Sequence, residues 1–160
     1  MRGNIDTRIN KLKNKEFDAI VLSLAGLKML NLEKEAKEVF SEKQMLPAIG
    51  QGAIALQCRL DDQKTLDILE MVNDQKSYCC IQAERSLLEA IGGDCDTAVG
   101  GLAKLSNNKI ILKSELFSND GSKKFVAESS GSFKEAKEIG YKVGKELLKK
   151  AGPDFKVQGN

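Results

Sequence analysis

The sequence predicts a mixed fold, in which part of an α/β lobe is followed by a small α+β domain. Three patterns predict it. Residues 1–60 contain uninterrupted apolar runs next to helical patterns, as in the buried strands of a parallel sheet. Residues 62–91 carry apolar side chains at helical spacing. After Gly93 the hydrophobic period changes to two, which is typical of antiparallel strands.

The N-terminal part has a helix, strand, helix pattern. Asn4 or Asp6 can cap a helix that runs to about Lys13. The apolar run at residues 19–22 predicts a buried strand, and residues 24–40 predict a second helix. This order is typical of one unit of an α/β lobe.

The stretch LPAIGQGAIALQCR, residues 46–59, interrupts this pattern. Its proline and glycines form a junction, and the apolar residues 53–58 that follow predict another buried strand. Such a junction before a strand suggests a crossover between two lobes. A parallel strand needs a neighbour on each edge, and the sequence up to this point supplies none. We therefore expect the chain to begin in the middle of a fold and to need a partner.

The last third of the chain predicts a small sheet with a helix on one face. Asn107–Asn108 and residues 119–122 supply the turns, because asparagine tolerates positive φ. Ser132 can cap a final helix that ends near Lys150. The three predicted antiparallel strands are residues 98–105, 109–117 and 123–131.

Composition excludes several classes of function. The net charge of +2, from 25 basic and 23 acidic residues, is too even for a nucleic-acid surface. No apolar run approaches the roughly 20 residues that span a bilayer. The chain has no histidine and no CxxC pair among its four cysteines, so we expect no metal site. We expect a cytoplasmic protein without nucleic-acid or membrane partners, because the cysteine usage suits a reducing compartment.

One thiol has unusual neighbours. In AIGGDCDTAVGG, residues 90–101, Cys95 stands between two aspartates and between two glycine pairs. The carboxylates disfavour a thiolate, and the glycines permit a bend. A small buried thiol on a turn is the alternative explanation. The other cysteines, Cys58, Cys79 and Cys80, suit packing positions, and Glu84 and Arg85 suit ion pairs at a helix surface or between lobes.

Three blocks in order carry a resemblance: RGNIDTRINKL (2–12), LPAIGQGAIALQCR (46–59) and AERSLLEAIGGDCDTAVG (83–100). Together they closely resemble the porphobilinogen deaminase (hydroxymethylbilane synthase) family over nearly the whole chain. The resemblance implies a transferase of tetrapyrrole and haem biosynthesis, which joins four porphobilinogen units into hydroxymethylbilane and releases ammonia. It also implies three domains: two lobes like those of a periplasmic binding protein, and a small α+β domain that carries the cysteine.

Matched to that family, the chain divides into five parts. Residues 1–45 would be part of the second lobe, and residues 46–60 a crossover strand of the first lobe. Residues 61–91 would be connecting helices, residues 92–152 the cysteine domain and residues 153–160 a tail. The family's N-terminal half, with its catalytic aspartate, has no counterpart here. We therefore expect no catalytic residue in this chain and no turnover by the chain alone.

Cys95 matches the family cysteine that holds a dipyrromethane cofactor through a thioether. The resemblance thus offers a reason for its acidic neighbours. A sulfur that is alkylated once, and then stays a thioether, does not need a persistent thiolate.

Five further residues match family positions that contact this cofactor. Arg2 and Arg8, about two helical turns apart, match arginines that bind its acetate and propionate groups, which guanidinium forks suit well. Gly50, Gln51 and Gly52 match the crossover motif, whose bare backbone N–H groups can approach the cofactor. Solvated arginines and a simple hinge are the respective alternatives.

Two function hypotheses remain open. The chain is either the C-terminal portion of the deaminase or a non-catalytic module that binds carboxylates or pairs with a separate N-terminal chain. The expected partners are porphobilinogen, polypyrrole intermediates, and either the missing half or a second copy. Met29 stands where the family usually has arginine, so one carboxylate contact is missing or falls to Lys28.

Overall fold

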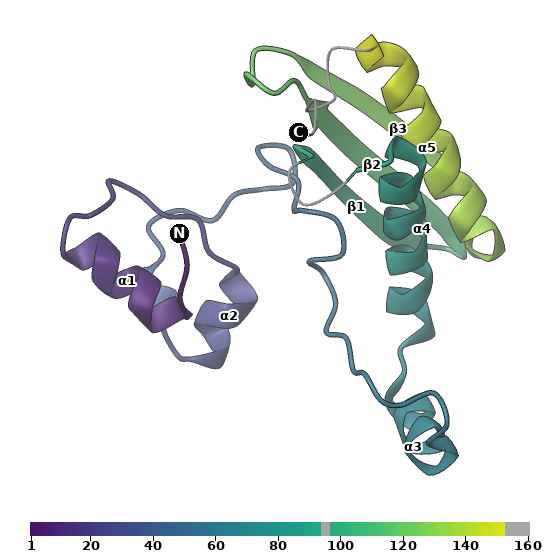
Figure 1. Cartoon of the computed structure of the whole chain (residues 1–160), viewed down its shortest axis with the longest axis horizontal. Coiled ribbons are helices and arrows are strands. Elements are labelled where there is room, and N and C mark those ends of the chain that lie inside the picture. Colours follow the sequence, from purple (N-terminus) through teal and green to yellow (C-terminus); the bar gives the residue numbers. More distant parts are fainter. Residues whose placement is uncertain (94–96, 153–160) are drawn as a thin grey trace. The chain divides into compact units, whose positions relative to one another are not determined.

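The structure is a computed structural model and describes residues 1–93 and 97–152. The chain divides into two compact units, Met1–Ser41 and Glu42–Asn160 (Figure 1). Among the described residues, no helix combines the length and the apolar content needed to cross a membrane.

The first unit is small and helical. It contains α1 (Ile5–Lys13), α2 (Leu24–Met29) and a short 3₁₀ helix, η1 (Glu33–Glu35). The helix predicted to end at Lys13 is thus confirmed. Gly26 brings α2 close to α1, because a Cβ at this position would lie 2.6 Å from Cδ1 of Ile5.

The second predicted helix is wrong over most of its length. Of residues 24–40, only α2 and η1 are helical. The chain turns after Leu30, where Asn31 adopts a left-handed conformation with φ of 57°. Such a residue stops an α-helix, and a helix as short as α2 has little propensity of its own to continue.

The two predicted strands in the first 60 residues are also wrong. Residues 19–22 and 53–58 are irregular, none of their side chains is buried, and several apolar ones are exposed, including Val21 at 60% and Ile54 at 86%. A strand is stable only when its edge groups and its faces are covered. Among the described residues, no neighbouring strand covers these segments. Their apolar composition therefore does not produce a sheet.

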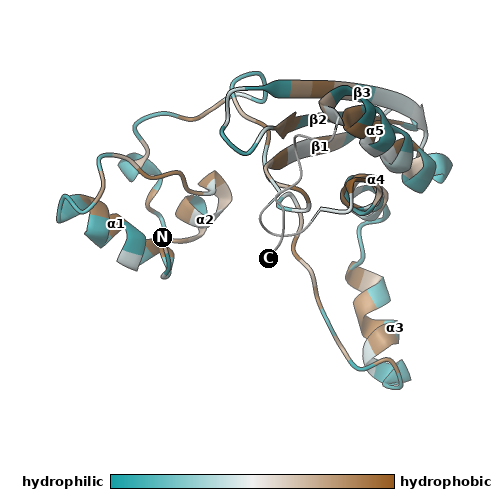
Figure 2. Cartoon of the chain, turned by 45° about the horizontal axis from the view of Figure 1, so that its top comes forward, coloured by the Kyte–Doolittle hydropathy of each residue, from teal (hydrophilic) through white to brown (hydrophobic). Residues whose placement is uncertain are grey.

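The second unit begins with two helices. α3 (Gln63–Val72) and α4 (Gln75–Ile91) confirm the prediction of helix over residues 62–91, with a break at residues 73–74. Asp62 caps α3 by accepting a hydrogen bond from the Thr65 backbone N–H. α3 carries hydrophobic residues along its length (Figure 2), although none of its residues is buried.

Three antiparallel strands follow in the order β1–β2–β3. They are β1 (Val99–Ser106), β2 (Lys109–Phe117) and β3 (Lys124–Ser132). Asn107 and Asn108 both take positive φ in the first turn, as predicted. The 3₁₀ helix η2 (Phe133–Glu135), which has a capping box between Ser132 and Glu135, leads into α5 (Ala136–Ala151). The predicted sheet and final helix are confirmed, and with them the mixed α/β class.

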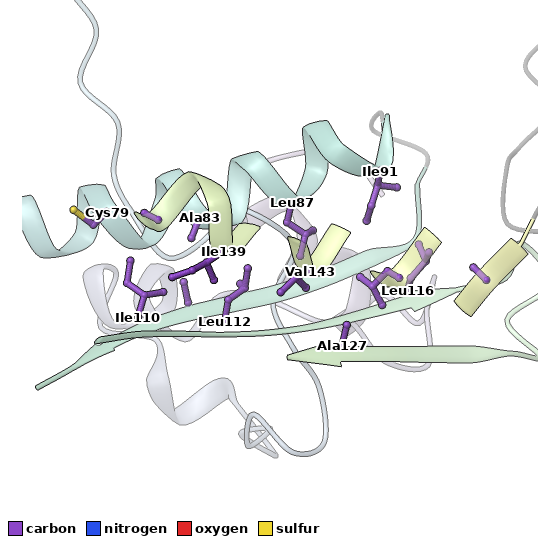
Figure 3. Packing of buried hydrophobic residues seen from close by; sticks show 14 residues of the cluster. Cys79, Ala83, Leu87, Ile91, Ile110, Leu112, Leu116, Ala127, Ile139 and Val143 are labelled. Carbon is purple, nitrogen blue, oxygen red and sulfur yellow. The ribbon is translucent and has the colours of Figure 1, made fainter. Parts of the chain in front are cut away.

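The core of the second unit lies between the sheet and the pair α4 and α5, which cover one face side by side (Figures 1 and 2). Leu87 of α4 and Val143 of α5 meet Leu112 and Leu116 of β2 there (Figure 3), and all four side chains are fully buried. The two helices approach closely at Gly140 of α5. This helix pair fixes one end of the segment that contains Cys95.

Candidate functional site

Cys95 lies outside the described residues, together with Asp94 and Asp96. A regular element lies within a few residues on each side of this segment. α4 ends at Ile91 and is capped by Gly92, which has a left-handed φ of 68°, and the Gly93 N–H donates to the Leu88 carbonyl at 3.2 Å. On the other side, the Ala98 carbonyl accepts from the Phe117 N–H at 2.9 Å. The predicted attachment residue is therefore bracketed by the end of α4 and the start of β1.

The second glycine pair of the AIGGDCDTAVGG stretch lies within β1 and does not form a bend. Instead, it makes room for residues 46–52, which we call the crossover loop. A Cβ on Gly100 would lie 3.2 Å from Cβ of Leu46, and one on Gly101 would lie 2.6 Å from Cδ1 of Ile49. The expectation that these glycines allow a bend is corrected: Gly100 lets the backbone at Leu46 and Pro47 approach β1, and Gly101 makes room for the Ile49 side chain.

The crossover loop covers part of the outer edge of β1, which is one of the two edge strands of the sheet. The Gly101 N–H donates to the Pro47 carbonyl at 2.9 Å, and Ala48 forms an isolated antiparallel bridge with Gly100. Unpaired N–H groups at a sheet edge otherwise need water or another chain. These bonds connect the second sequence block (46–59) to β1, which begins at the end of the third block (83–100).

Glu84 of α4 supplies the next acceptor along the same edge. Its Oε1 accepts from the Ala103 N–H at 2.9 Å, and its Oε2 accepts from the Gly50 N–H at 2.8 Å. The side chain is only 3% exposed. The prediction of an ion pair for Glu84 is wrong, because two backbone N–H groups satisfy the buried carboxylate instead.

The burial of Glu84 can be predicted from the spacing of residues on α4. Cys80, Ala83, Glu84 and Leu87 follow the spacing i, i+3, i+4, i+7, so they share one face of α4. A glutamate on an otherwise apolar face is expected to be buried and to need donors. The pattern indicates burial, but it does not identify the donors.

The turn at Gly50, Gln51 and Gly52 has one face open. Gly50 adopts a φ of 75°, which favours glycine. The Gln51 N–H donates to the Ala48 carbonyl at 3.2 Å. Within the described ranges, apart from the glycine itself and its two chain neighbours, no residue has a heavy atom within 4 Å of a Cβ built on Gly50 or Gly52. With two of the three N–H groups bonded inside the protein, Gly52 is the one left to donate to a ligand, as far as the described residues show.

The two arginines belong to the first unit. Arg8 lies on α1, and its Nε donates to the Gly3 carbonyl at 2.7 Å. Arg2 is exposed and precedes α1, so the two arginines do not lie two turns apart on one helix as expected. In the part of the chain that the structure describes, neither makes an ion pair. Their guanidinium groups are thus available to carboxylates.

Comparison with known families gives two matches in the order of the sequence. Residues 1–67 match the family model described as "Porphobilinogen deaminase, dipyromethane cofactor binding domain", and residues 78–149 match "Porphobilinogen deaminase, C-terminal domain". The chain belongs to the porphobilinogen deaminase family. The resemblance of the three sequence blocks is thereby confirmed.

Curated porphobilinogen deaminases match nearly the whole chain. The protein from Ehrlichia chaffeensis is 44% identical over 150 residues, and that from Coxiella burnetii strain RSA 493 is 40% identical over 152. The protein from Syntrophomonas wolfei is 39% identical over 152 residues. These alignments cover 92–95% of the chain but only 49–50% of the relatives. The chain thus spans about half the length of the curated porphobilinogen deaminases that it matches.

The Glu84 contacts join the two matched regions. Gly50 lies in the region that matches the cofactor-binding model, whereas Glu84 and Ala103 lie in the region that matches the C-terminal model. A single buried carboxylate therefore connects two regions that the porphobilinogen deaminase models treat as separate domains.

Three of the four cysteines lie in the described part of the chain, and all three are free thiols. Cys79 is a core residue, and Cys80 packs against the core, as expected. Burial raises the pKa of the Cys80 thiol, and the negative charge of Glu84 raises this pKa further. Cys80 is therefore a poor nucleophile near neutral pH.

We expect iodoacetamide to alkylate Cys80 several-fold more slowly at pH 8 than it alkylates an exposed peptide cysteine. A raised pKa leaves less thiolate, so the rate should keep rising above the pH at which a free thiol levels off. Replacing Glu84 with glutamine removes a repelling charge and should speed the reaction. Tandem mass spectrometry distinguishes Cys80 from Cys79 on the same peptide. Equal rates for Cys80 and the free thiol would contradict the prediction.

Proposed function

We propose that this chain supplies the C-terminal half of a working porphobilinogen deaminase, also called hydroxymethylbilane synthase. That enzyme joins four porphobilinogen units into hydroxymethylbilane and releases ammonia. The supporting observation is the ordered match to both domain models, at about 40% identity to curated deaminases. The proposal includes a role in haem biosynthesis and the cytoplasmic location predicted from the cysteine usage.

The proposal assigns a dipyrromethane to Cys95 through a thioether. When bound, this group supplies the pyrrole end from which the product chain grows. The residues around the proposed site suit it. Both flanks of the cysteine segment are anchored, and Gly52 presents an N–H and open space. The cofactor is therefore proposed to lie near the turn at residues 50–52. The proposal keeps the parts predicted from the sequence: residues 1–45 as part of the second lobe, residues 46–60 as the crossover segment and residues 92–152 as the cysteine domain.

The residues of this chain are proposed to bind and orient the cofactor and the growing pyrrole chain. Arg2 and Arg8 are proposed to hold the carboxylates of the cofactor and of the growing chain, because guanidinium groups stay charged at any working pH. Gly52 donates a backbone hydrogen bond. The carboxylate that assists deamination is proposed to come from the N-terminal half of the protein, so this chain contributes no catalytic residue.

Exposed apolar side chains follow the crossover loop, and in the proposed enzyme another chain covers them. Ile54 is 86% exposed and Leu60 is 95% exposed. Apolar side chains that follow one another along an irregular segment favour a covering partner. We propose that the N-terminal half of the enzyme covers them, and self-association is the second possibility.

Co-expression with the N-terminal half of the Coxiella burnetii deaminase, as a separate chain, tests the proposal. We expect the 160-residue chain to gain the mass of one dipyrromethane and to give a colour reaction with an aromatic aldehyde in acid. Intact-mass spectrometry of the purified complex measures this. A complex that consumes porphobilinogen while this chain stays unmodified would refute the cofactor assignment. A stable complex with neither turnover nor modification would favour the non-catalytic partner module.

A further inference from the structure

Glu84 joins its own helix to two segments that are far apart in the sequence. It lies on α4, the helix that precedes the cysteine segment, and it bonds Ala103 of β1, the strand that follows that segment. It also bonds Gly50, 34 positions away in the sequence. We propose that Glu84 is a positioning residue, which fixes the turn at residues 50–52 relative to the two elements that bracket Cys95. This inference rests on the proposed function only where it concerns the cofactor.

A carboxylate suits this position for a chemical reason. Both of its oxygens are acceptors, so each can take one of the two N–H groups. A glutamine offers one oxygen and one NH₂ group, and the NH₂ group would face a backbone donor. An aspartate is one methylene shorter and reaches less far. Burial strengthens hydrogen bonds to a charged acceptor, so the pair of bonds holds the turn firmly.

The bond to Gly50 has a distinct place in the crossover loop. Residues 46–49 are held to β1 by the bond from Gly101 to Pro47, the bridge at Ala48 and the contact of Ile49 with Gly101. Among the described residues, the bond from Gly50 to Glu84 is the last one from the loop to α4 or β1 before the exposed segment begins. Loss of Glu84 should therefore release residues 50–52 while residues 46–49 stay docked.

Amide hydrogen exchange, followed by NMR on the purified chain, tests the coupling. In Glu84→Gln we expect the Gly50 amide to exchange at least tenfold faster than in the wild type, which corresponds to about 1.4 kcal/mol. The matched control is Ser86→Ala. Ser86 is also buried on α4, but its hydroxyl donates to the Lys137 carbonyl, away from the turn. The exposed Glu89→Gln serves as the charge control.

The control separates positioning from a loss of stability alone. Both Glu84→Gln and Ser86→Ala should lower the urea midpoint and speed exchange at core amides such as Leu112. Only Glu84→Gln should add the extra acceleration at Gly50. If the two variants speed Gly50 exchange equally for an equal loss of stability, the role of Glu84 is structural only and the inference is overturned.

A second readout tests the effect on the cofactor in the complex with the N-terminal half. We expect the dipyrromethane-loaded fraction to fall at least tenfold in Glu84→Gln and to stay at the wild-type level in Ser86→Ala. Equal loading of Glu84→Gln and wild type would overturn the positioning role. If the wild type itself stays unloaded, the proposed function fails, and the exchange comparison alone decides the inference.

Discussion

Replacing Gly140 with alanine is expected to lower the free energy of unfolding of the second unit by about 3 kcal/mol. A Cβ at this position would lie 2.1 Å from the Ala83 carbonyl oxygen and 2.9 Å from Cβ of Ser86. The nearest obstacle is backbone, which has no rotamer to change. The helices α4 and α5 must therefore separate, although the better helix propensity of alanine offsets about 1 kcal/mol. Urea denaturation followed by circular dichroism measures the change.

Two further variants on α5 calibrate this result. Gly144→Ala places a Cβ 2.6 Å from Cβ of Ala90 and 2.8 Å from the Leu87 carbonyl oxygen, so it should also destabilise the unit. Lys149→Ala alters only an exposed side chain of the same helix and should shift the free energy by about 0.5 kcal/mol at most. A Gly140→Ala protein with the urea midpoint of the wild type would contradict the close approach of α4 and α5.

The sheet and its helices could be predicted from the sequence because their signals are local. Alternation with period two defines β1 to β3, and the asparagine pair at residues 107–108 accepts the positive φ that the first turn needs. The Ser132 cap defines the start of the final helical stretch. Each of these features depends on neighbours within a few residues, so no knowledge of distant contacts was needed.

The strands predicted at residues 19–22 and 53–58 depended on distant neighbours instead. An uninterrupted apolar run indicates a segment that can be buried, but a parallel strand forms only between two others. Ile54 and its neighbours have the composition of a buried strand and are exposed. The apolar composition therefore predicted the wrong secondary structure, and the need for a partner that it suggests stays a prediction.

The contacts of the candidate site were missed for a related reason. Glu84 is 34 residues from Gly50 and 19 from Ala103, and no local pattern links such positions. The sequence predicts a bend at Gly100 and Gly101, because only the conformational freedom of a glycine is visible in a sequence. Their function depends on the approach of Leu46 and Ile49, which only the fold shows.

Replacing Cys95 with serine is expected to abolish cofactor attachment completely in the complex with the N-terminal half. A thioether requires sulfur, and a serine hydroxyl is a far weaker nucleophile than a thiol. The expected intact mass of the variant chain is that of the unmodified polypeptide, and the aldehyde colour reaction should be absent. Size-exclusion chromatography should still show the complex, which separates a failure of attachment from a failure of assembly.

Cys80→Ser and Cys58→Ser are the matched controls, because each removes one thiol at another position. Cys80 is a poor candidate for alkylation, since burial and the charge of Glu84 raise its pKa. Both controls should carry one dipyrromethane at the wild-type level. If the group instead disappears from Cys80→Ser and persists in Cys95→Ser, the attachment site is on α4. A Cys95→Ser complex that turns over porphobilinogen at the wild-type rate would show that no covalent primer on this segment is needed.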